Sequence, residues 1–241
     1  MATVTNSKIE QYYFELFRSD FELPAGHIKY HDKPDVLIQV EATGQTVGIE
    51  ITNFYLQDGA AITSEQRQRP LREKVVRIAQ QLYANTGGRK IELSVDFSPL
   101  HAISDCKKLA VALADFAKAI SGKVQGYTNY SPSAEIPELR WIYHNGNEYQ
   151  DAKWSVMQSF EGVQLCPARL REIVAIKDEL AKNYCRTDCL WLLLIVDFMD
   201  LAQDQELVWP LGESLKSSAF DRIIIYKPQF RQLLEIKIDS V

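Results

Sequence analysis

Two acidic residues in the first quarter of the chain could together bind a metal ion. Asp35 follows Pro34 at the start of a predicted strand, and Glu50 lies near the end of the next one. A β-hairpin that turns near Gly44 would bring both carboxylates to the same end of a sheet. Two close carboxylates repel each other unless a cation lies between them, and proteins bind Mg²⁺ through one or two carboxylates together with water and substrate phosphates. The pair could therefore bind a divalent metal ion that polarises a phosphodiester, and the alternative is two hairpin-end carboxylates that face solvent.

The elements that must position this pair follow from hydrophobic periodicity and from turn residues. Helices are predicted over residues 7–17, 64–83, 105–120 and 167–184. Strands are predicted over residues 27–30, 36–40, 47–52, 90–97, 140–143, 154–165, 190–196, 222–226 and 234–238. Because the composition does not change along the 241 residues, this order predicts a single α/β domain over residues 1–241, with a central mixed sheet flanked by helices.

The sequence around the acidic pair resembles the PD-(D/E)XK nuclease superfamily. The likeness consists of Pro34–Asp35, fourteen further residues, and then Glu50–Ile51–Thr52 on an apolar strand. The order helix, three strands, helix, strand over residues 1–100 is similar to that family's core, and residues 101–241 would add helices and strands to the same domain. The resemblance implies a restriction-endonuclease-like fold and a deoxyribonuclease, endo- or exo-, that depends on Mg²⁺ or Mn²⁺. It also implies that Asp35, Glu50 and the Ile51 carbonyl are metal ligands.

The chain departs from that family at the position where a lysine is usual. Thr52 stands there, and its hydroxyl could orient the attacking water but could not stabilise the negative charge that develops on phosphorus. Lys74, on the predicted helix after the strand, is the best candidate for a relocated cation, and a solvated helix lysine is the alternative. Lys177 is a weaker candidate, because nothing in the sequence places its helix near the site.

Glu10 is the preferred acidic contribution from the first helix. It borders the apolar stripe that the helical spacing predicts, whereas Glu15 lies on the opposite side. A carboxylate at that border could hold a water molecule or a second metal ion. The alternative is a capping box, since Ser7 is three residues before Glu10. The apolar stripe is predicted to consist of Ile9, Tyr12, Tyr13, Leu16 and Phe17.

The charge distribution bears on the substrate. The chain has 27 Lys and Arg against 32 Asp and Glu, a formal charge of −5, which excludes a basic coat that binds nucleic acid everywhere. Between residues 65 and 90, however, seven basic residues face two acidic ones. Such a segment could contact DNA phosphates, and a self-repelling solvated helix face is the alternative. The predicted phosphate contacts are Arg67, Arg69, Arg72 and Arg77.

Other features narrow the class of protein. The four cysteines are too sparse for a disulfide scaffold, and the Cys185/Cys189 pair lacks the second pair that a zinc site requires. The first residues show no signal peptide and no apolar run reaches a membrane span, so a cytoplasmic location is expected. Tyr127, Asn129 and Tyr130 could stack on bases or pack in a loop.

The sequence supports two functions. The first is a DNA nuclease, with RNA as a further substrate and homodimer formation both left open. The alternative is a catalytically inactive protein of the nuclease fold that binds nucleic acid or another protein. An active enzyme requires that Asp35, Glu50 and an ammonium group converge within about one metal coordination shell.

Overall fold

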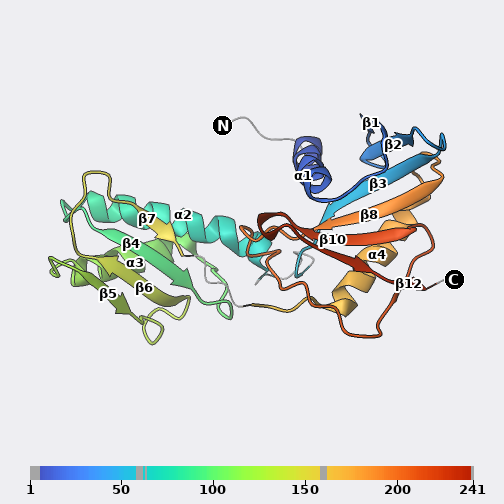
Figure 1. The fold of residues 1–241 in the computed structure, drawn as a ribbon. Coiled ribbons are helices and arrows are strands. Elements are labelled where there is room, and N and C mark those ends of the chain that lie inside the picture. The colour runs from blue at the N-terminus through green and yellow to red at the C-terminus, as the bar shows by residue number, and fades with distance from the viewer. Residues whose placement is uncertain (1–5, 58–61, 63, 158–161, 240–241) are drawn as a thin grey trace. The chain divides into compact units, whose positions relative to one another are not determined.

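The chain forms two compact units (Figure 1). The structure is a computed structural model that describes residues 6–57, 62, 64–157 and 162–239. The outer unit comprises residues 1–56 and 161–241, and the inserted unit comprises residues 57–160. Where the sequence predicts one domain with an elaborated C-terminal half, the chain instead leaves the first unit after Leu56, builds a second unit, and returns.

The outer unit contains a six-stranded mixed sheet with the strand order β1-β2-β3-β8-β10-β11. Strands β1, β2 and β3 form an antiparallel meander, and β3 and β10 lie on either side of β8 and run parallel to it. A short pair, β9 with β12, accompanies this sheet. The bounds of the elements are α1 Asn6–Asp20, β1 Gly26–Tyr30, β2 Val36–Val40, β3 Thr46–Asn53, α4 Pro167–Ala181, β8 Cys189–Ile195, β9 Leu215–Lys216, β10 Arg222–Lys227, the 3₁₀ turn Pro228–Phe230, β11 Gln232–Ile236 and β12 Ile238–Asp239.

Both faces of the outer sheet are buried. Helix α1 covers one face through Tyr13, Phe14 and Phe17, which pack with alternate residues of the strands. Helix α4 covers the other face through Leu170 and its neighbours. Strand β8 is therefore buried on both sides, which explains its unbroken apolar run, because a central parallel strand has no solvent face.

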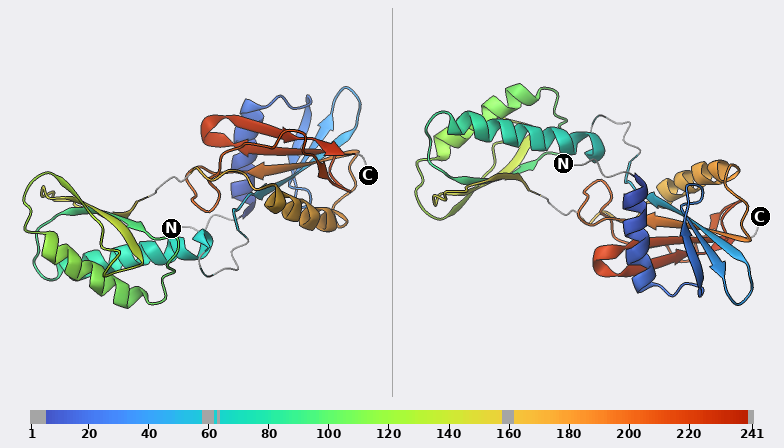
Figure 2. Two further views of the ribbon diagram at one scale, coloured as in Figure 1. Left: turned by 90° about the horizontal axis from the view of Figure 1, so that it is seen from below. Right: turned by 90° about the horizontal axis from the view of Figure 1, so that it is seen from above.

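The inserted unit contains a four-stranded sheet with the order β5-β6-β4-β7. Its elements are α2 Glu65–Ala84, β4 Glu92–Phe97, α3 Cys106–Ile120, β5 Tyr127–Tyr130, β6 Leu139–Asn145 and β7 Trp154–Val156. Both helices lie on the same side of this sheet (Figure 2). They form one core with the inward residues of the strands, among them Leu93, Val95 and Ile142. Among the described residues of this unit, no helix lies on the other side of the sheet.

Several predicted elements differ from the structure. The buried stripe of α1 is Tyr13, Phe14 and Phe17, while Ile9 and Tyr12 are exposed. The predicted strand over residues 154–165 is confined to β7 among the described residues, and residues 158–161 lie outside them. Strands β5 and β9 were not predicted, because one is only four residues long and the other two.

The predicted continuation of the core after Thr52 is the largest difference. The helix and strand expected to complete it, now α2 and β4, belong to the inserted unit. Within the outer unit, β3 is followed by α4 and then by β8, which pairs with β3 in parallel. Among the described residues, no helix is long and apolar enough to cross a membrane.

Candidate active site

The hairpin of β2 and β3 places Asp35 beside the open end of β3. The last residue pair between the two strands is Val36 with Ile49, so β3 continues beyond this point without β2 as a partner. Asp35, directly before β2, uses its carboxylate there, and Oδ2 accepts the backbone N–H of Ile51 at 2.6 Å. Where the backbone pairing of β2 with β3 has ended, the side chain of Asp35 therefore accepts a backbone N–H of β3, and this hydrogen bond holds its carboxylate against the strand.

Glu50 projects from the face of β3 that α4 covers. Val47, Ile49 and Ile51 pack with α1, so the alternation of the strand directs Glu50 to the other side. There, Oε1 of Glu50 accepts a hydrogen bond from Nζ of Lys177 at 2.8 Å, and both side chains are largely buried. The cation at this site is therefore Lys177. Lys74, the preferred sequence candidate, is an exposed residue of α2 in the inserted unit.

Gly48 fixes the approach of Pro34 to β3. A Cβ atom added at Gly48 would lie 2.7 Å from Cγ of Pro34 and 3.0 Å from side-chain atoms of Leu190 and Thr187. The glycine therefore does not leave room for a ligand beside Glu50. It lets the ring of Pro34 pack directly on the strand, and this contact sets the position of the next residue, Asp35.

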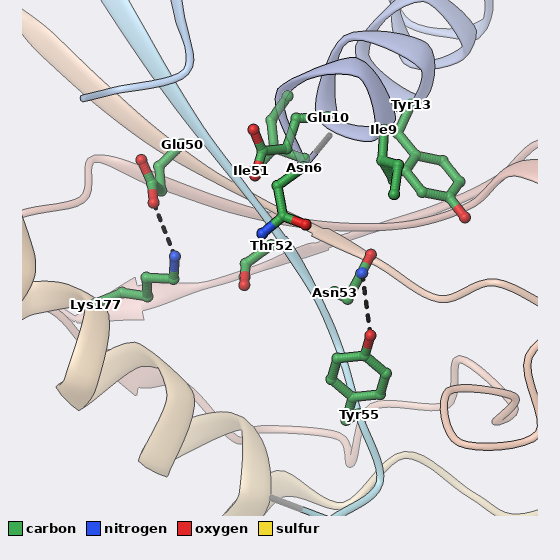
Figure 3. Close-up of a pocket in the computed structure, with 10 residues that line it drawn as sticks. All are labelled: Asn6, Ile9, Glu10, Tyr13, Glu50, Ile51, Thr52, Asn53, Tyr55 and Lys177. Carbon is green, nitrogen blue, oxygen red and sulfur yellow. Dashed lines mark hydrogen bonds and ion pairs between the residues drawn. The ribbon is translucent and has the colours of Figure 1, made fainter. Parts of the chain in front are cut away.

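A pocket of about 340 Å³ lies at the open end of β3 (Figure 3). Glu50 and Lys177 line it, whereas Asp35 is not one of its lining residues. Its polar lining combines residues of α1, β3 and α4 with Tyr55, whose hydroxyl accepts a hydrogen bond from Nδ2 of Asn53 at 3.3 Å. The lining includes four of the predicted site residues, Glu10, Glu50, Ile51 and Thr52, together with Lys177.

Glu10 reaches this pocket from the buried side of α1. It lies three, four and seven residues before Tyr13, Phe14 and Phe17, so all four share one face of the helix. The prediction that Glu10 borders the buried face is confirmed, although the buried face differs from the predicted stripe. Because α1 begins at Asn6, Ser7 already lies inside the helix, where it cannot be the N-cap of a capping box.

The charge of Glu50 affects the pKa values of the neighbouring acidic groups. Burial and, next, the charge of Glu50 raise the pKa of Asp35 to about 7, against the partial opposition of the Ile51 N–H and Lys177. Burial and Glu50 also raise the pKa of Glu10. The pKa of the Tyr184 hydroxyl is raised as well, by burial and by the facing Glu50 carboxylate. The pocket therefore holds more negative charge than Lys177 neutralises.

Two carboxylates, those of Asp35 and Glu50, are the candidate metal ligands. Among the described residues, no three His, Cys, Asp or Glu side chains form a group that could hold a metal ion. Asp35 and Glu50 nevertheless fit a hard divalent cation, because such an ion needs only one or two carboxylates. Oε2 of Glu50 is buried without a hydrogen-bond partner in the described part of the chain, which is an unsatisfied acceptor in the right place.

Comparison with known proteins gives no relative. No family model, no curated protein and no solved structure matches this chain.

The predicted phosphate contacts all lie on α2 of the inserted unit. Arg67, Arg69 and Arg77 are exposed, and Arg69 pairs with Glu73 at 3.4 Å. Arg72 is buried, because it forms an ion pair with Glu65 at 2.8 Å and its guanidinium lies over the ring of Phe97. It holds the helix to its sheet and presents no charge to a ligand.

Lys177 was ranked low in the sequence, although a signal for it exists. It follows Leu170, Ile173 and Val174 by seven, four and three residues, so it continues the buried stripe of α4. A lysine in line with such a stripe must meet an acidic partner or lose its charge. What the sequence did not supply was the pairing of β8 with β3, which brings α4 over Glu50.

Proposed function

We propose that this protein is a metal-dependent nuclease that hydrolyses DNA phosphodiester bonds, with a PD-(D/E)XK-like core in the outer unit. The single observation that carries the proposal is the placing of two carboxylates and an ammonium along one stretch of β3: Asp35 accepts the Ile51 N–H, and the neighbouring Glu50 holds Nζ of Lys177. The order of elements supports it. With the inserted unit left aside, α1, β1, β2, β3, α4 and β8 follow one another as helix, three strands, helix and strand, the order that the resemblance implies.

The acidic pair would hold Mg²⁺ or Mn²⁺. Asp35 and Glu50 provide hard oxygen ligands. Burial and, next, the charge of Glu50 raise the pKa of Asp35 to about 7, and a bound cation would relieve the repulsion between the two carboxylates. The Ile51 carbonyl is proposed as a further ligand. When bound, the ion would polarise the phosphodiester and lower the pKa of a coordinated water.

The remaining residues of the pocket have roles that follow from their charge. The ammonium of Lys177 would stabilise the negative charge that grows on the phosphate oxygens, the task for which Thr52 lacks a charge. The Thr52 hydroxyl lines the pocket and would orient the attacking water. Glu10 lines the same pocket and would hold a water molecule or a second ion.

A second function is a nuclease fold that binds nucleic acid without cleaving it. Two observations favour it. Lys177 is engaged by Glu50 in an ion pair, and the described residues contain no group of three metal-binding side chains. The two functions differ in one measurable property, which is hydrolysis that depends on a divalent ion.

A cleavage assay tests the proposal. Purified protein is incubated with plasmid, linear duplex DNA, single-stranded DNA and RNA, with Mg²⁺ or Mn²⁺ or with EDTA. We expect DNA cleavage that requires the ion and that rises as the pH passes through about 7, because metal binding needs the charged form of Asp35. Asp35→Asn and Glu50→Gln should each lower the rate by at least about 100-fold, a typical effect of losing one key catalytic group.

The matched control is Glu179→Gln, which removes an exposed carboxylate of α4 that pairs with Lys182 at 2.6 Å. It should leave the rate unchanged. Cleavage that survives EDTA, or that survives both Asp35→Asn and Glu50→Gln, would contradict the proposed site. Absence of cleavage on every substrate by the folded wild type would favour the binding protein.

A further inference from the structure

A groove lies at one edge of the inserted sheet. Strand β7 is an end strand of this sheet and pairs with β4. Helix α2 lies beside β7 (Figure 1). The two elements line a pocket of about 420 Å³, and every lining residue belongs to the inserted unit. This pocket is therefore separate from the acidic pocket of the outer unit.

The groove follows the backbone of β7. Four consecutive residues, 153–156, line it. Because successive side chains of a strand point to opposite faces of the sheet, four residues in a row share one pocket only where that pocket lies along the strand edge. The opposite wall is one face of α2, with residues at positions i, i+3, i+4 and i+7: Glu73, Val76, Arg77 and Gln80.

The side chain of Gln80 already pairs with this edge as a neighbouring strand would. Its Nε2 donates to the backbone carbonyl of Ala152 at 2.9 Å, and its Oε1 accepts the N–H of Trp154 at 3.4 Å. A strand added to a sheet forms such contacts, one as donor and one as acceptor, with every second residue of its partner. The edge of β7 therefore binds an amide group of the chain itself.

Beyond Gln80 the edge presents further backbone groups. Met157 donates its N–H to the carbonyl of Val95 in β4 at 2.8 Å. Since successive residues of a strand direct their backbone groups to opposite sides, the N–H of Val156 and the carbonyl of Trp154 point away from β4. Among the described residues, no hydrogen bond engages the Val156 N–H. A donor and an acceptor of this kind are what an extended peptide pairs with when it adds a strand.

Apolar groups form the floor of the groove. Val76 and Trp154 belong to the core of the inserted unit, and Val156 packs against that core. All three line the pocket. In an added strand, every second side chain would face α2 and contact these groups, so an apolar residue is favoured at that position.

The rim of the groove is basic. Arg77 and Lys153 are exposed and line the pocket, and neither forms a hydrogen bond or an ion pair with a described residue. The acidic residue of the lining, Glu73, pairs with Arg69 at 3.4 Å. The charge that is left without a partner is therefore positive, which favours acidic side chains in the bound peptide.

Two other occupants match the groove less well. A second copy of this chain, paired edge to edge through β7, would bring Arg77 and Lys153 of each copy towards those of the other. Nucleic-acid phosphates would be attracted to both basic residues, but they have no hydrogen-bond donor for the carbonyl of Trp154. A peptide offers backbone donors and acceptors, apolar side chains and carboxylates together.

We propose that the groove between α2 and β7 binds an extended segment of a partner protein, which adds a strand to the edge of β7. Its backbone would pair with the Val156 N–H and the Trp154 carbonyl. Its side chains would alternate between apolar residues that face α2 and acidic residues near Arg77 and Lys153. The proposal does not depend on the proposed nuclease function.

The test begins with selection of a peptide. Random peptides of about eight residues, the length of an ordinary strand, are displayed on phage and selected on the immobilised full-length chain. We expect enrichment of sequences in which apolar and acidic residues alternate and which lack proline. An enriched peptide is then synthesised with a fluorescent label, and its Kd for the full-length protein is measured by anisotropy.

Two kinds of variant probe the groove. Val156→Pro removes the outward N–H and leaves the hydrogen bonds to β4 intact, so it should weaken binding at least about 5-fold, whereas Val156→Thr keeps the N–H and should retain binding. Arg77→Glu and Lys153→Glu each reverse an exposed charge and should weaken binding about 3- to 10-fold. Lys107→Glu makes the same change at an exposed residue of α3 and is the control. Circular dichroism checks the fold of each variant.

Each contrary outcome identifies a different error. If no alternating acidic pattern is enriched, or if Arg77→Glu and Val156→Pro bind the peptide as the wild type does, the peptide site is overturned. If an oligodeoxythymidylate of about 20 nucleotides displaces the peptide, the groove takes nucleic acid instead. If sedimentation shows a dimer that Val156→Pro dissociates, the occupant is a second copy of the chain. Failure of the cleavage assay leaves all of these results unchanged.

Discussion

The two sheets of this protein differ in how many of their faces are covered, and this difference decides where chemistry can be placed. The outer sheet lies between α1 and α4, so a carboxylate on its central strand is buried and must find a partner. In the part of the inserted unit that the structure describes, both helices lie on one side of the sheet, and the other side presents aromatic and polar side chains. A sheet covered on both faces can shift the pKa values of the charged groups that it buries. A sheet covered on one face leaves the other face exposed for contact with a ligand or another molecule.

The strand sequences reflect this difference. Strand β8 is a continuous apolar run, since α1 covers one of its sides and α4 the other. Strand β6 alternates less regularly, with Leu139 and Ile142 inside and Trp141 outside, because a register shift between Asp96 and Phe97 of its partner strand disturbs the period. The sequence pattern therefore predicts nearly the whole of β8 but only part of β6.

Removal of the buried cation is the sharpest test of the covered sheet. Lys177→Ala would leave the Glu50 carboxylate buried without its ion-pair partner, and the loss of one member of such a pair costs about 3–5 kcal/mol. We expect the outer unit to lose this much free energy of unfolding and the inserted unit to lose none. Urea unfolding followed by hydrogen exchange, resolved peptide by peptide, measures the two units separately.

The control is Lys182→Ala, which breaks an exposed pair with Glu179 at the end of the same helix. It should change the stability by less than about 1 kcal/mol. If Lys177→Ala costs no more than this control, Glu50 is not held as an uncompensated charge in the variant and the contrast between the two sheets is weaker than described.

Overpacking at Gly48 tests how closely the acidic pair is positioned. Gly48→Ala places a methyl group 2.7 Å from Cγ of Pro34, so either the ring or the strand must move, at a cost of about 1–3 kcal/mol. Because Asp35 follows Pro34, its hydrogen bond to Ile51 should lengthen as well. A thermal melt measures the first effect, and the chemical shift of the Ile51 amide reports the second.

Gly122→Ala in the inserted unit is the matched substitution, since no atom lies within 4 Å of an added Cβ there. It should be neutral or slightly stabilising, because alanine restricts the unfolded chain more than glycine does. An equal loss of stability in both variants would mean that the contact with Pro34 is not the cause.

Local patterns predicted more of this structure than long-range ones did. The hairpin, the orientation of Glu50 away from Ile49 and Ile51, and the side of α1 on which Glu10 lies all depend on residues close in the sequence. The partner of β3 could not be predicted in the same way. That partner is β8, and an insertion of about a hundred residues lies between β3 and β8 in the sequence. The helix and strand that follow β3 directly, α2 and β4, were therefore assigned to the same core instead.

The same reason explains why Lys177 ranked below Lys74. Lys74 is 22 residues from Thr52 in sequence and Lys177 is 125, so proximity along the chain favoured Lys74, whereas the ammonium that contacts Glu50 is that of Lys177. The burial of Arg72 was equally hidden, because its partners Glu65 and Phe97 are set by the packing of α2 on the inserted sheet. The sequence indicates the type of each side chain and the periodicity of each element, but it does not indicate which residues of distant elements contact them.

The dependence of stability on pH distinguishes the units by sign. The pKa of Asp35 in the outer unit is raised from 3.8 to about 7 by burial and by Glu50. Its folded state thus binds the proton more tightly, so this contribution to stability is complete below about pH 3.8 and is lost as the pH rises through about 7. The outer unit should become more stable on mild acidification, by at most about 1.4 kcal/mol per pH unit from this group.

His144 gives the inserted unit the opposite slope. Its ring is fully buried, and neither ring nitrogen has a hydrogen-bond partner among the described residues. Burial, followed by the charges of Lys123 and Arg89, lowers its pKa below 6.5. The unfolded chain therefore binds the proton more tightly, so stability is retained above pH 6.5 and lost as the pH falls below it.

Hydrogen exchange between pH 5 and 8, corrected for intrinsic rates, reports both slopes in one sample. Asp35→Asn should flatten the slope of the outer unit alone, and His144→Leu should flatten that of the inserted unit alone, because each substitution removes the titrating group and leaves the other unit untouched. If either variant changes the slope of both units, the two share one unfolding transition. The charge placed inside the covered sheet would then influence the half-covered one through cooperative unfolding.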